Sequence, residues 1–161
     1  MKFKPEKTVF GRHESFALRY GWLTKGFQAF EQNKEIFSSP DAIVTLGVGK
    51  NMVNSIRHWL RAARLADIDP GKKAVTPLGT AIFSKNGGDP YLEDEATIWL
   101  IHWLLSTNPR HATAWYWFFN RFHKPEFTSK EVTSALISFV ADRITAKTSV
   151  TTIKSDAAVL L

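Results

Sequence analysis

The order of predicted elements between residues 38 and 84 constrains the fold of this chain more than any other feature. A capping serine followed by a proline, in Ser38-Ser39-Pro40-Asp41, precedes a short apolar segment that predicts a helix over 41–46. The turn Gly47-Val48-Gly49 separates this helix from a longer amphipathic segment that predicts a helix over 50–64. Two helices separated by a tight glycine turn are typical of a helix-turn-helix.

A small hairpin and a further helix are predicted directly after these two helices. Residues 65–68 and 73–76 are expected to form strands, joined by the turn Asp69-Pro70-Gly71-Lys72. The pair Thr76-Pro77 then predicts the start of a helix over 78–83. Helix, turn, helix, hairpin and helix is the order of a winged helix-turn-helix, so the expected fold is mainly α with a small β-hairpin wing.

Additional aromatic-rich helices are expected on both sides of this core. Helical spacing and caps predict these helices at 15–33, 93–106, 112–122 and 129–145. The last helix carries a capping box, Thr128 with Glu131 three residues later. The strongest break, at 86–90, divides the chain into residues 1–84 and a helical segment, 85–161, packed on them. The final residues resemble the interior of an amphipathic element, so we expect a longer protein.

The predicted helix over 50–64 has two chemically different faces. Its apolar face recurs at steps of three and four residues, through Met52 or Val53, Ile56, Leu60 and Ala63. Its polar face recurs at the same steps, through Lys50, Asn54, Arg57, Arg61 and Arg64, with Asn51 and His58 beside it. One face is therefore expected to join the core and the other to face a partner.

The polar face has the chemistry of a recognition helix. Lysine and arginine neutralise phosphates, and arginine and asparagine also bind base edges in the major groove. Such helices contact bases near their N-terminal end. The predicted DNA-binding residues are Lys50, Asn51, Asn54 and Ser55 at the bases, Arg57, His58, Arg61 and Arg64 toward the phosphates, and Lys72 and Lys73 on the wing.

The charge distribution favours a polyanionic partner. The formal net charge is +6, and residues 50–64 contain four positive side chains and no acid, whereas 89–95 contain four acids and no base. Double-stranded DNA is therefore the expected partner. A basic helical face can also be merely solvated, and winged helices also serve as protein-protein modules, so an adaptor without direct DNA contact is the alternative.

The absence of cysteine excludes a disulfide framework, a thiolate zinc site and a cysteine nucleophile. The charged N-terminus does not resemble a signal peptide. No apolar run approaches the roughly 20 residues that cross a bilayer. We expect a soluble, cytoplasmic protein that does not enter a membrane.

The second half of the chain is rich in aromatic residues, including Trp99, Trp103 and the run 115–119. Their helical spacing predicts a buried core. Exposed tryptophans would instead favour a docking surface for another protein.

No motif predicts catalysis, a metal or a cofactor. The chain has no HExxH and no GxSxG pattern, and residues 47–50 lack the spacing of a phosphate loop. We expect a protein that is not an enzyme. A close approach of His13 and Glu14 to Asp89 or Asp94 would instead favour a nuclease.

Several strings of residues resemble an uncharacterised bacterial family, domain of unknown function 4007 (DUF4007). The resembling strings are residues 10–16, 19–23, 46–53, 56–57, 59–60, 76–79, 89–94 and 115–120. The resemblance implies a longer protein, encoded in DNA-modification and phage-defence gene islands and in some cases near phosphorothioation enzymes. The resemblance implies a DNA-linked role by gene neighbourhood, or equally an adaptor for other defence-island proteins, and it assigns no catalytic residue. Together with the basic helix at 50–64 it favours a regulator or targeting subunit that contacts DNA.

Overall fold

The computed structural model describes residues 2–161, which divide into two compact units. One unit is Leu18–Leu104, and the other combines the chain up to Ala17 with Leu105–Leu161. Neither boundary coincides with the expected division between residues 84 and 85. The N-terminal segment instead packs with the C-terminal helices.

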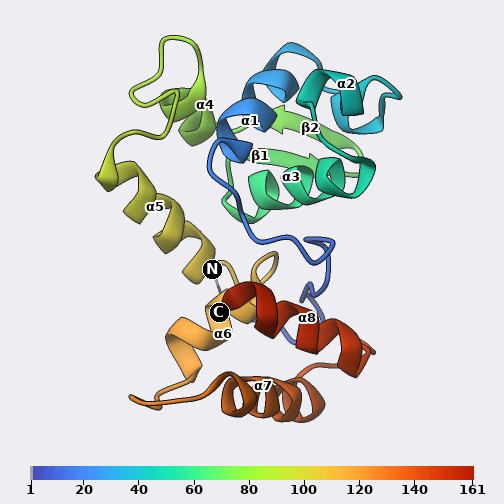
Figure 1. Cartoon of the computed structure of the whole chain (residues 1–161), viewed down its shortest axis with the longest axis vertical. Coiled ribbons are helices and arrows are strands. Elements are labelled where there is room, and N and C mark those ends of the chain that lie inside the picture. Colours follow the sequence, from blue (N-terminus) through green and yellow to red (C-terminus); the bar gives the residue numbers. More distant parts are fainter. Residues whose placement is uncertain (1) are drawn as a thin grey trace. The chain divides into compact units, whose positions relative to one another are not determined.

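The unit Leu18–Leu104 contains the predicted helix, turn, helix, hairpin and helix (Figure 1). Its elements in order are α1 (Trp22–Gln32), the short 3-10 helix η1 (Ile36–Ser38), α2 (Ala42–Leu46), α3 (Lys50–Ala62), β1 (Ala66–Asp69), β2 (Lys72–Val75), α4 (Pro77–Phe83) and most of α5 (Glu95–Ser106). Gly47, with φ of 60°, ends α2 in the left-handed conformation that glycine adopts without strain. The predicted order of elements is confirmed.

The hairpin is a two-stranded antiparallel ladder in which Ala66 pairs with Val75 and Asp69 with Lys72. Gly71, with φ of 82°, supplies the left-handed residue of its turn. Both strands agree with the expectation to within a residue.

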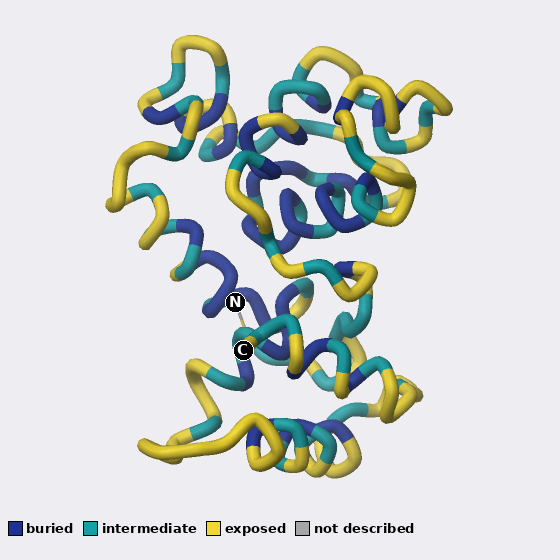
Figure 2. The backbone as a smooth tube through the Cα atoms, in the orientation of Figure 1, coloured by how far each residue is buried: buried dark blue, intermediate teal, exposed yellow. Residues whose placement is uncertain are grey.

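The core of this unit lies where α1, α3 and α4 meet. Phe27, Phe30 and Trp59 are almost completely buried, and the rings of Phe27 and Phe83 lie 5.9 Å apart. In Figure 2 the buried part of the tube follows α1 and α3. This packing fixes which side of α3 remains available to a partner.

The first helix is shorter than expected. It begins at Trp22, not near Ser15, because Gly21 precedes it with φ of 78°. Glu14 and Ser15 also have positive φ, which interrupts a right-handed helix. The prediction of a helix from residue 15 is therefore wrong, and residues 2–21 follow an irregular path.

The second unit packs the N-terminal segment with α6 (Thr113–Arg121), α7 (Ser129–Arg143) and α8 (Val150–Leu160). Its apolar core is formed by Ala114, Trp117, Val132, Leu136, Val140, Ile153 and Ala157. Trp117 confirms the expectation of an aromatic core in this region, and Phe118 and Phe122 pack around it.

The capping box that begins α7 is present. The backbone N–H of Glu131 donates to Thr128 Oγ1, and the Glu131 carboxylate accepts from the Thr128 backbone N–H at 2.7 Å. Lys124, followed by the backbone and hydroxyl of Thr128, lowers the pKa of Glu131 to about 2.

Among residues 2–161, no helix combines the length and the apolar character that a membrane span requires.

Candidate functional site

The two predicted faces of α3 are separated in the structure. Ile56, Leu60 and Ala63 of the apolar face are completely buried. On the other face Lys50 and Asn51 are exposed, and Asn54 and Arg57 are half-buried. The N-terminal half of α3 therefore presents polar and cationic side chains beside the turn at Gly47.

Ser55 does not belong to this surface. Its side chain is 0% exposed, one residue away from fully buried Ile56. The prediction that Ser55 lies nearest the bases is corrected, because the side of α3 that carries it faces the core.

Three of the predicted cations are paired with carboxylates of the same unit. Arg61 forms an ion pair with Asp69, and Lys72 pairs with Asp67 at 2.5 Å. Lys73 pairs with Glu35, which precedes η1. The wing consequently presents less positive charge than its two lysines alone predict.

The hairpin register explains the pairing of Lys72 with Asp67. Asp67 and Asp69 are two residues apart on β1 and project from one face, as Lys72 does from β2. Asp67 was expected in a strand and Asp69 in a turn, and neither acid was expected to offset the charge of the wing. Pairing the two strands in register would have identified them.

The C-terminal part of the polar face is less accessible than its N-terminal part. Arg64 follows α3 with φ of 58°, and burial lowers the pKa of its guanidinium. The imidazole of His58 packs edge-on against the Trp59 ring, with centroids 5.2 Å apart. No ion pair of Lys50 or Arg57 is found within residues 2–161, so these two are the cations of α3 best placed for an external anion.

Two tryptophans expected in a core are exposed. Trp99 and Trp103 lie one turn apart on α5 and are 69% and 58% exposed. Ile98 beside them is also exposed. The prediction of a buried position is wrong for both tryptophans, because the spacing that aligned them does not reveal whether another element covers that side of the helix.

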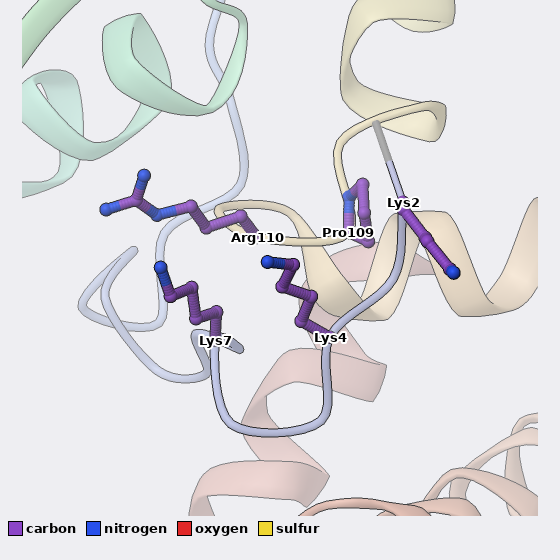
Figure 3. Close-up of a pocket in the computed structure, with 5 residues that line it drawn as sticks. All are labelled: Lys2, Lys4, Lys7, Pro109 and Arg110. Carbon is purple, nitrogen blue, oxygen red and sulfur yellow. The ribbon is translucent and has the colours of Figure 1, made fainter.

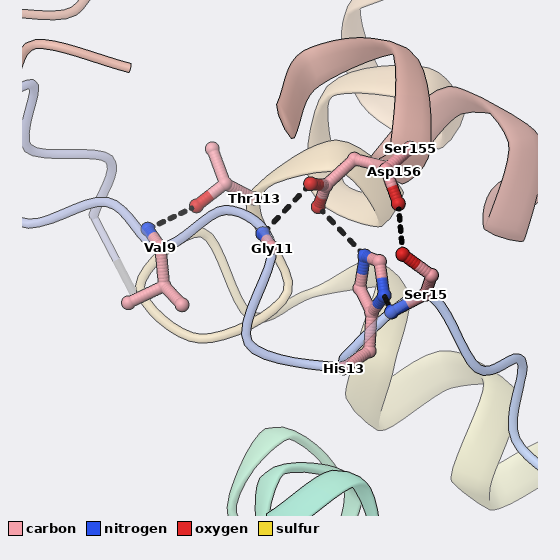
Figure 4. Close-up of polar contacts among 7 residues, drawn as sticks. All are labelled: Val9, Gly11, His13, Ser15, Thr113, Ser155 and Asp156. Atoms are coloured by element: carbon pink, nitrogen blue, oxygen red, sulfur yellow. Dashed lines mark hydrogen bonds and ion pairs between the residues drawn. The ribbon is translucent and has the colours of Figure 1, made fainter. Parts of the chain in front are cut away.

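His13 belongs to a buried polar cluster around Asp156 of α8 (Figure 4). The Asp156 carboxylate accepts from the Gly11 backbone N–H at 2.7 Å and lies 3.3 Å from His13 Nε2. His13 Nδ1 accepts from the Ser15 backbone N–H at 3.1 Å. These contacts orient the imidazole with Nδ1 toward the Ser15 backbone and Nε2 toward the Asp156 carboxylate. The cluster attaches the N-terminal segment to α8, which gives His13 a structural role.

The acidic segment before α5 is organised around Asp89. Burial alone would raise the pKa of Asp89, but the backbone N–H groups of Glu93 and Asp94 donate to its carboxylate and lower the pKa below its ordinary value. Asp89 thus shapes the chain just before α5.

Across residues 2–161 no three His, Cys, Asp or Glu side chains gather in a way that could hold a metal ion.

Comparison with known proteins identifies relatives of this chain. The sequence profile of a family described as "Protein of unknown function (DUF4007)" matches residues 10–161. A magnesium-ion-bound crystal structure of SspB is 34% identical, with a TM-score of 0.82 over 92% of this chain and 47% of the SspB chain. A second SspB crystal structure is 33% identical, with a TM-score of 0.82 over 94% of this chain and 48% of the other. No curated protein matches.

Two points follow from these comparisons. The expected resemblance to this family is confirmed, and the fold described above is also the fold of part of SspB. The chain spans about half the length of the SspB chains that it matches.

Proposed function

The chain belongs to the DUF4007 family of proteins of unknown function, and from this premise we propose that it is a DNA-binding protein. In this proposal residues 38–84 form a winged helix-turn-helix that places α3 in the major groove. The protein acts in the cytoplasm as a regulator or targeting subunit of a bacterial DNA-modification or phage-defence system. It acts by binding and not by catalysis.

The observation that carries this proposal is the accessible polar face of the N-terminal half of α3. Lys50, Asn51, Asn54 and Arg57 lie together next to the turn that joins α2 to α3. Recognition helices contact bases with this part of their length, and asparagine can bind adenine edges bidentately. Lys50 and Arg57 would neutralise phosphates, which supplies affinity irrespective of sequence.

The ion pairs on the wing are compatible with this role. Exposed pairs contribute about 0–1 kcal/mol each, so a phosphate can replace the carboxylate at little cost. We therefore retain Arg61, Lys72 and Lys73 as secondary DNA contacts, and Arg64 and His58 as flanking ones. Lys50, Asn51, Asn54 and Arg57 form the centre of the proposed interface.

The double variant Lys50→Gln/Arg57→Gln is expected to bind a 20-base-pair duplex about tenfold more weakly at low salt. The slope of log affinity against log salt should fall in magnitude by about 2, because two phosphate contacts are lost. Fluorescence anisotropy over a salt series measures both quantities. Glutamine preserves helix propensity, so the fold of α3 is retained.

The matched control is Lys130→Gln/Lys154→Gln, which removes two exposed charges from α7 and α8. If both double variants lose affinity equally, net charge and not α3 governs binding, and the proposal is refuted.

The same titrations repeated with Mg²⁺ should leave the duplex intact. Strand breakage by the purified chain would overturn the statement that it acts without catalysis.

Exposed Trp99 and Trp103 favour a second function, an adaptor that docks other proteins of the same system. Large exposed aromatic side chains on one helical face are typical of interaction surfaces, where tryptophan contributes strongly to affinity. This surface lies on α5 and not on α3, so the two functions can be tested separately.

The variant Trp99→Gln/Trp103→Gln is expected to lose at least about tenfold affinity for a protein encoded beside this gene, because interface tryptophans contribute about 2 kcal/mol or more each. Binding to DNA should be unchanged. Co-purification followed by titration with each neighbouring gene product measures the effect, with Val150→Gln as an exposed apolar control on α8. Retained affinity for every neighbour that binds the wild-type chain would exclude the surface on α5.

A further inference from the structure

A basic pocket lies in the unit that contains the N-terminal segment, and none of its lining residues belongs to the proposed DNA interface (Figure 3). It encloses about 210 Å³ and is lined by Lys2, Lys4, Lys7, Pro109 and Arg110. In Figure 3 the ammonium groups of Lys4 and Lys7 rise toward the Arg110 side chain, whose guanidinium extends past Lys7, whereas Lys2 points away from them. None of the described lining residues is acidic.

A hydrogen-bonded turn places Lys4 and Lys7 together. The backbone N–H of Lys7 donates to the carbonyl oxygen of Lys4 at 2.9 Å. This turn contains Glu6, which does not line the pocket. Both lysine side chains therefore extend from the same short turn toward Arg110.

The segment is anchored on both sides of this turn. Before it, the ring of Phe3 stacks on Tyr116 of α6, with centroids 5.9 Å apart and planes within 4°. After it, the backbone N–H of Val9 donates to Thr113 Oγ1 at 3.0 Å. The turn is thus held against α6, so the backbone that carries the two lysine side chains is already positioned before a ligand binds.

The backbone that carries Arg110 is fixed as well. Asn108 is completely buried, and its side-chain oxygen accepts from the backbone N–H groups of Arg110 and His111 at 3.3 and 3.2 Å. Pro109 lies between Asn108 and Arg110 and restricts the backbone further. Three cationic groups are therefore presented from two independently fixed loops.

We propose that Lys4, Lys7 and Arg110 form a phosphate-binding site. Like charges held near one another repel, and a bound dianion or phosphodiester converts this repulsion into attraction. Arginine offers two parallel donors to phosphate oxygens, and lysine acts as a mobile point charge. The pocket is large enough for one phosphate group with part of the molecule that carries it.

The phosphate can come from a nucleic-acid backbone or from a small phosphorylated ligand. In the first case the site contacts the phosphates of a bound duplex, and in the second it binds a metabolite independently of DNA. The site does not depend on the function proposed for α3, because no residue is shared between the two. Separate probes distinguish the two sources.

The test compares the full-length wild-type chain with Lys4→Gln/Lys7→Gln, using a 20-base-pair duplex and inorganic pyrophosphate as probes. We expect this variant to bind at least one probe about tenfold more weakly at low salt, as for the loss of two phosphate contacts. Arg110→Gln should weaken the binding of the same probe. The control Lys130→Gln/Lys154→Gln should change the affinity for that probe less than twofold. All exchanged lysines are exposed, so the melting temperature serves as a check on folding.

Each outcome decides the proposal. Weaker duplex binding assigns the site to a nucleic-acid backbone, and weaker pyrophosphate binding alone assigns it to a small phosphate ligand. Unchanged binding of both probes overturns the site, as does an equal loss in the control variant. Failure of Lys50→Gln/Arg57→Gln to weaken duplex binding bears only on α3 and leaves this result intact.

Discussion

Replacing Asp156 by alanine is expected to lower the free energy of unfolding by about 3 kcal/mol, because a buried backbone N–H would lose its acceptor and a buried imidazole would lose the carboxylate beside it. The Gly11 backbone N–H donates to Oδ2 at 2.7 Å, and His13 Nε2 lies 3.3 Å from Oδ1. His13 and Asp156 are both almost completely buried, so water cannot readily replace the lost acceptor. Urea unfolding followed by circular dichroism measures the loss.

Asp156→Asn separates the loss of an acceptor from the loss of side-chain volume. An amide retains one acceptor oxygen for the Gly11 N–H but no longer offers a carboxylate oxygen to His13 Nε2, so we expect a loss of about 1–2 kcal/mol. The control Asp142→Asn removes the same charge from an exposed position of α7 and should change stability by less than about 0.5 kcal/mol. Equal stability of the Asp156 and Asp142 variants would show that the cluster does not hold the fold.

The polar cluster around Asp156 also holds the segment that carries the lysines of the basic pocket. Gly11 and His13 follow the turn that carries Lys4 and Lys7, and they attach this part of the chain to α8. Hydrogen exchange of the Gly11 amide should therefore accelerate in both Asp156 variants.

Local sequence signals predicted most of the secondary structure. Thr76 caps α4 through a hydrogen bond from the Gly79 N–H to Thr76 Oγ1 at 3.0 Å, and Pro77 occupies the first turn, as expected. Thr128 and Glu131 begin α7 in the same way. Such signals involve residues at most a few positions apart, so a single sequence contains all the information that they require.

Contacts between distant residues could not be predicted in this way. Gly11 and Asp156 are separated by 145 positions, and no periodic pattern connects them. Lys73 and Glu35 form an ion pair across 38 positions. Trp99 and Trp103 were assigned to a core because helical spacing shows which side chains share a face, but not what lies opposite that face. The sequence therefore predicted the polar face of α3. It did not predict the carboxylates that pair with the cations around this face, which are Glu35, Asp67 and Asp69.

Replacing Gly79 by alanine is expected to destabilise the unit Leu18–Leu104 by about 2–3 kcal/mol, although alanine is ordinarily the better helix former by about 1 kcal/mol. A Cβ atom at this position would collide with the carbonyl oxygen of Leu65 and lie 2.6 Å from Cε2 of Phe27. The Leu65 carbonyl cannot easily move, because it accepts from both the backbone N–H and the hydroxyl of Thr76 at 3.0 Å. Phe27 is fully buried against Phe83.

Gly88→Ala is the matched control for this substitution. Its added Cβ would meet only the Ala81 carbonyl oxygen at 3.7 Å, an ordinary contact, so stability should change by less than about 0.5 kcal/mol. Thermal and urea unfolding of the two variants give the sign of the effect directly. If Gly79→Ala were stabilising, helix propensity would outweigh the contact, and α4 could not lie as close to Leu65 as the structure places it. A destabilised Gly79→Ala with a neutral Gly88→Ala would establish that this close approach holds α4 against the end of α3 and the hairpin, and thereby fixes the surface proposed to meet DNA.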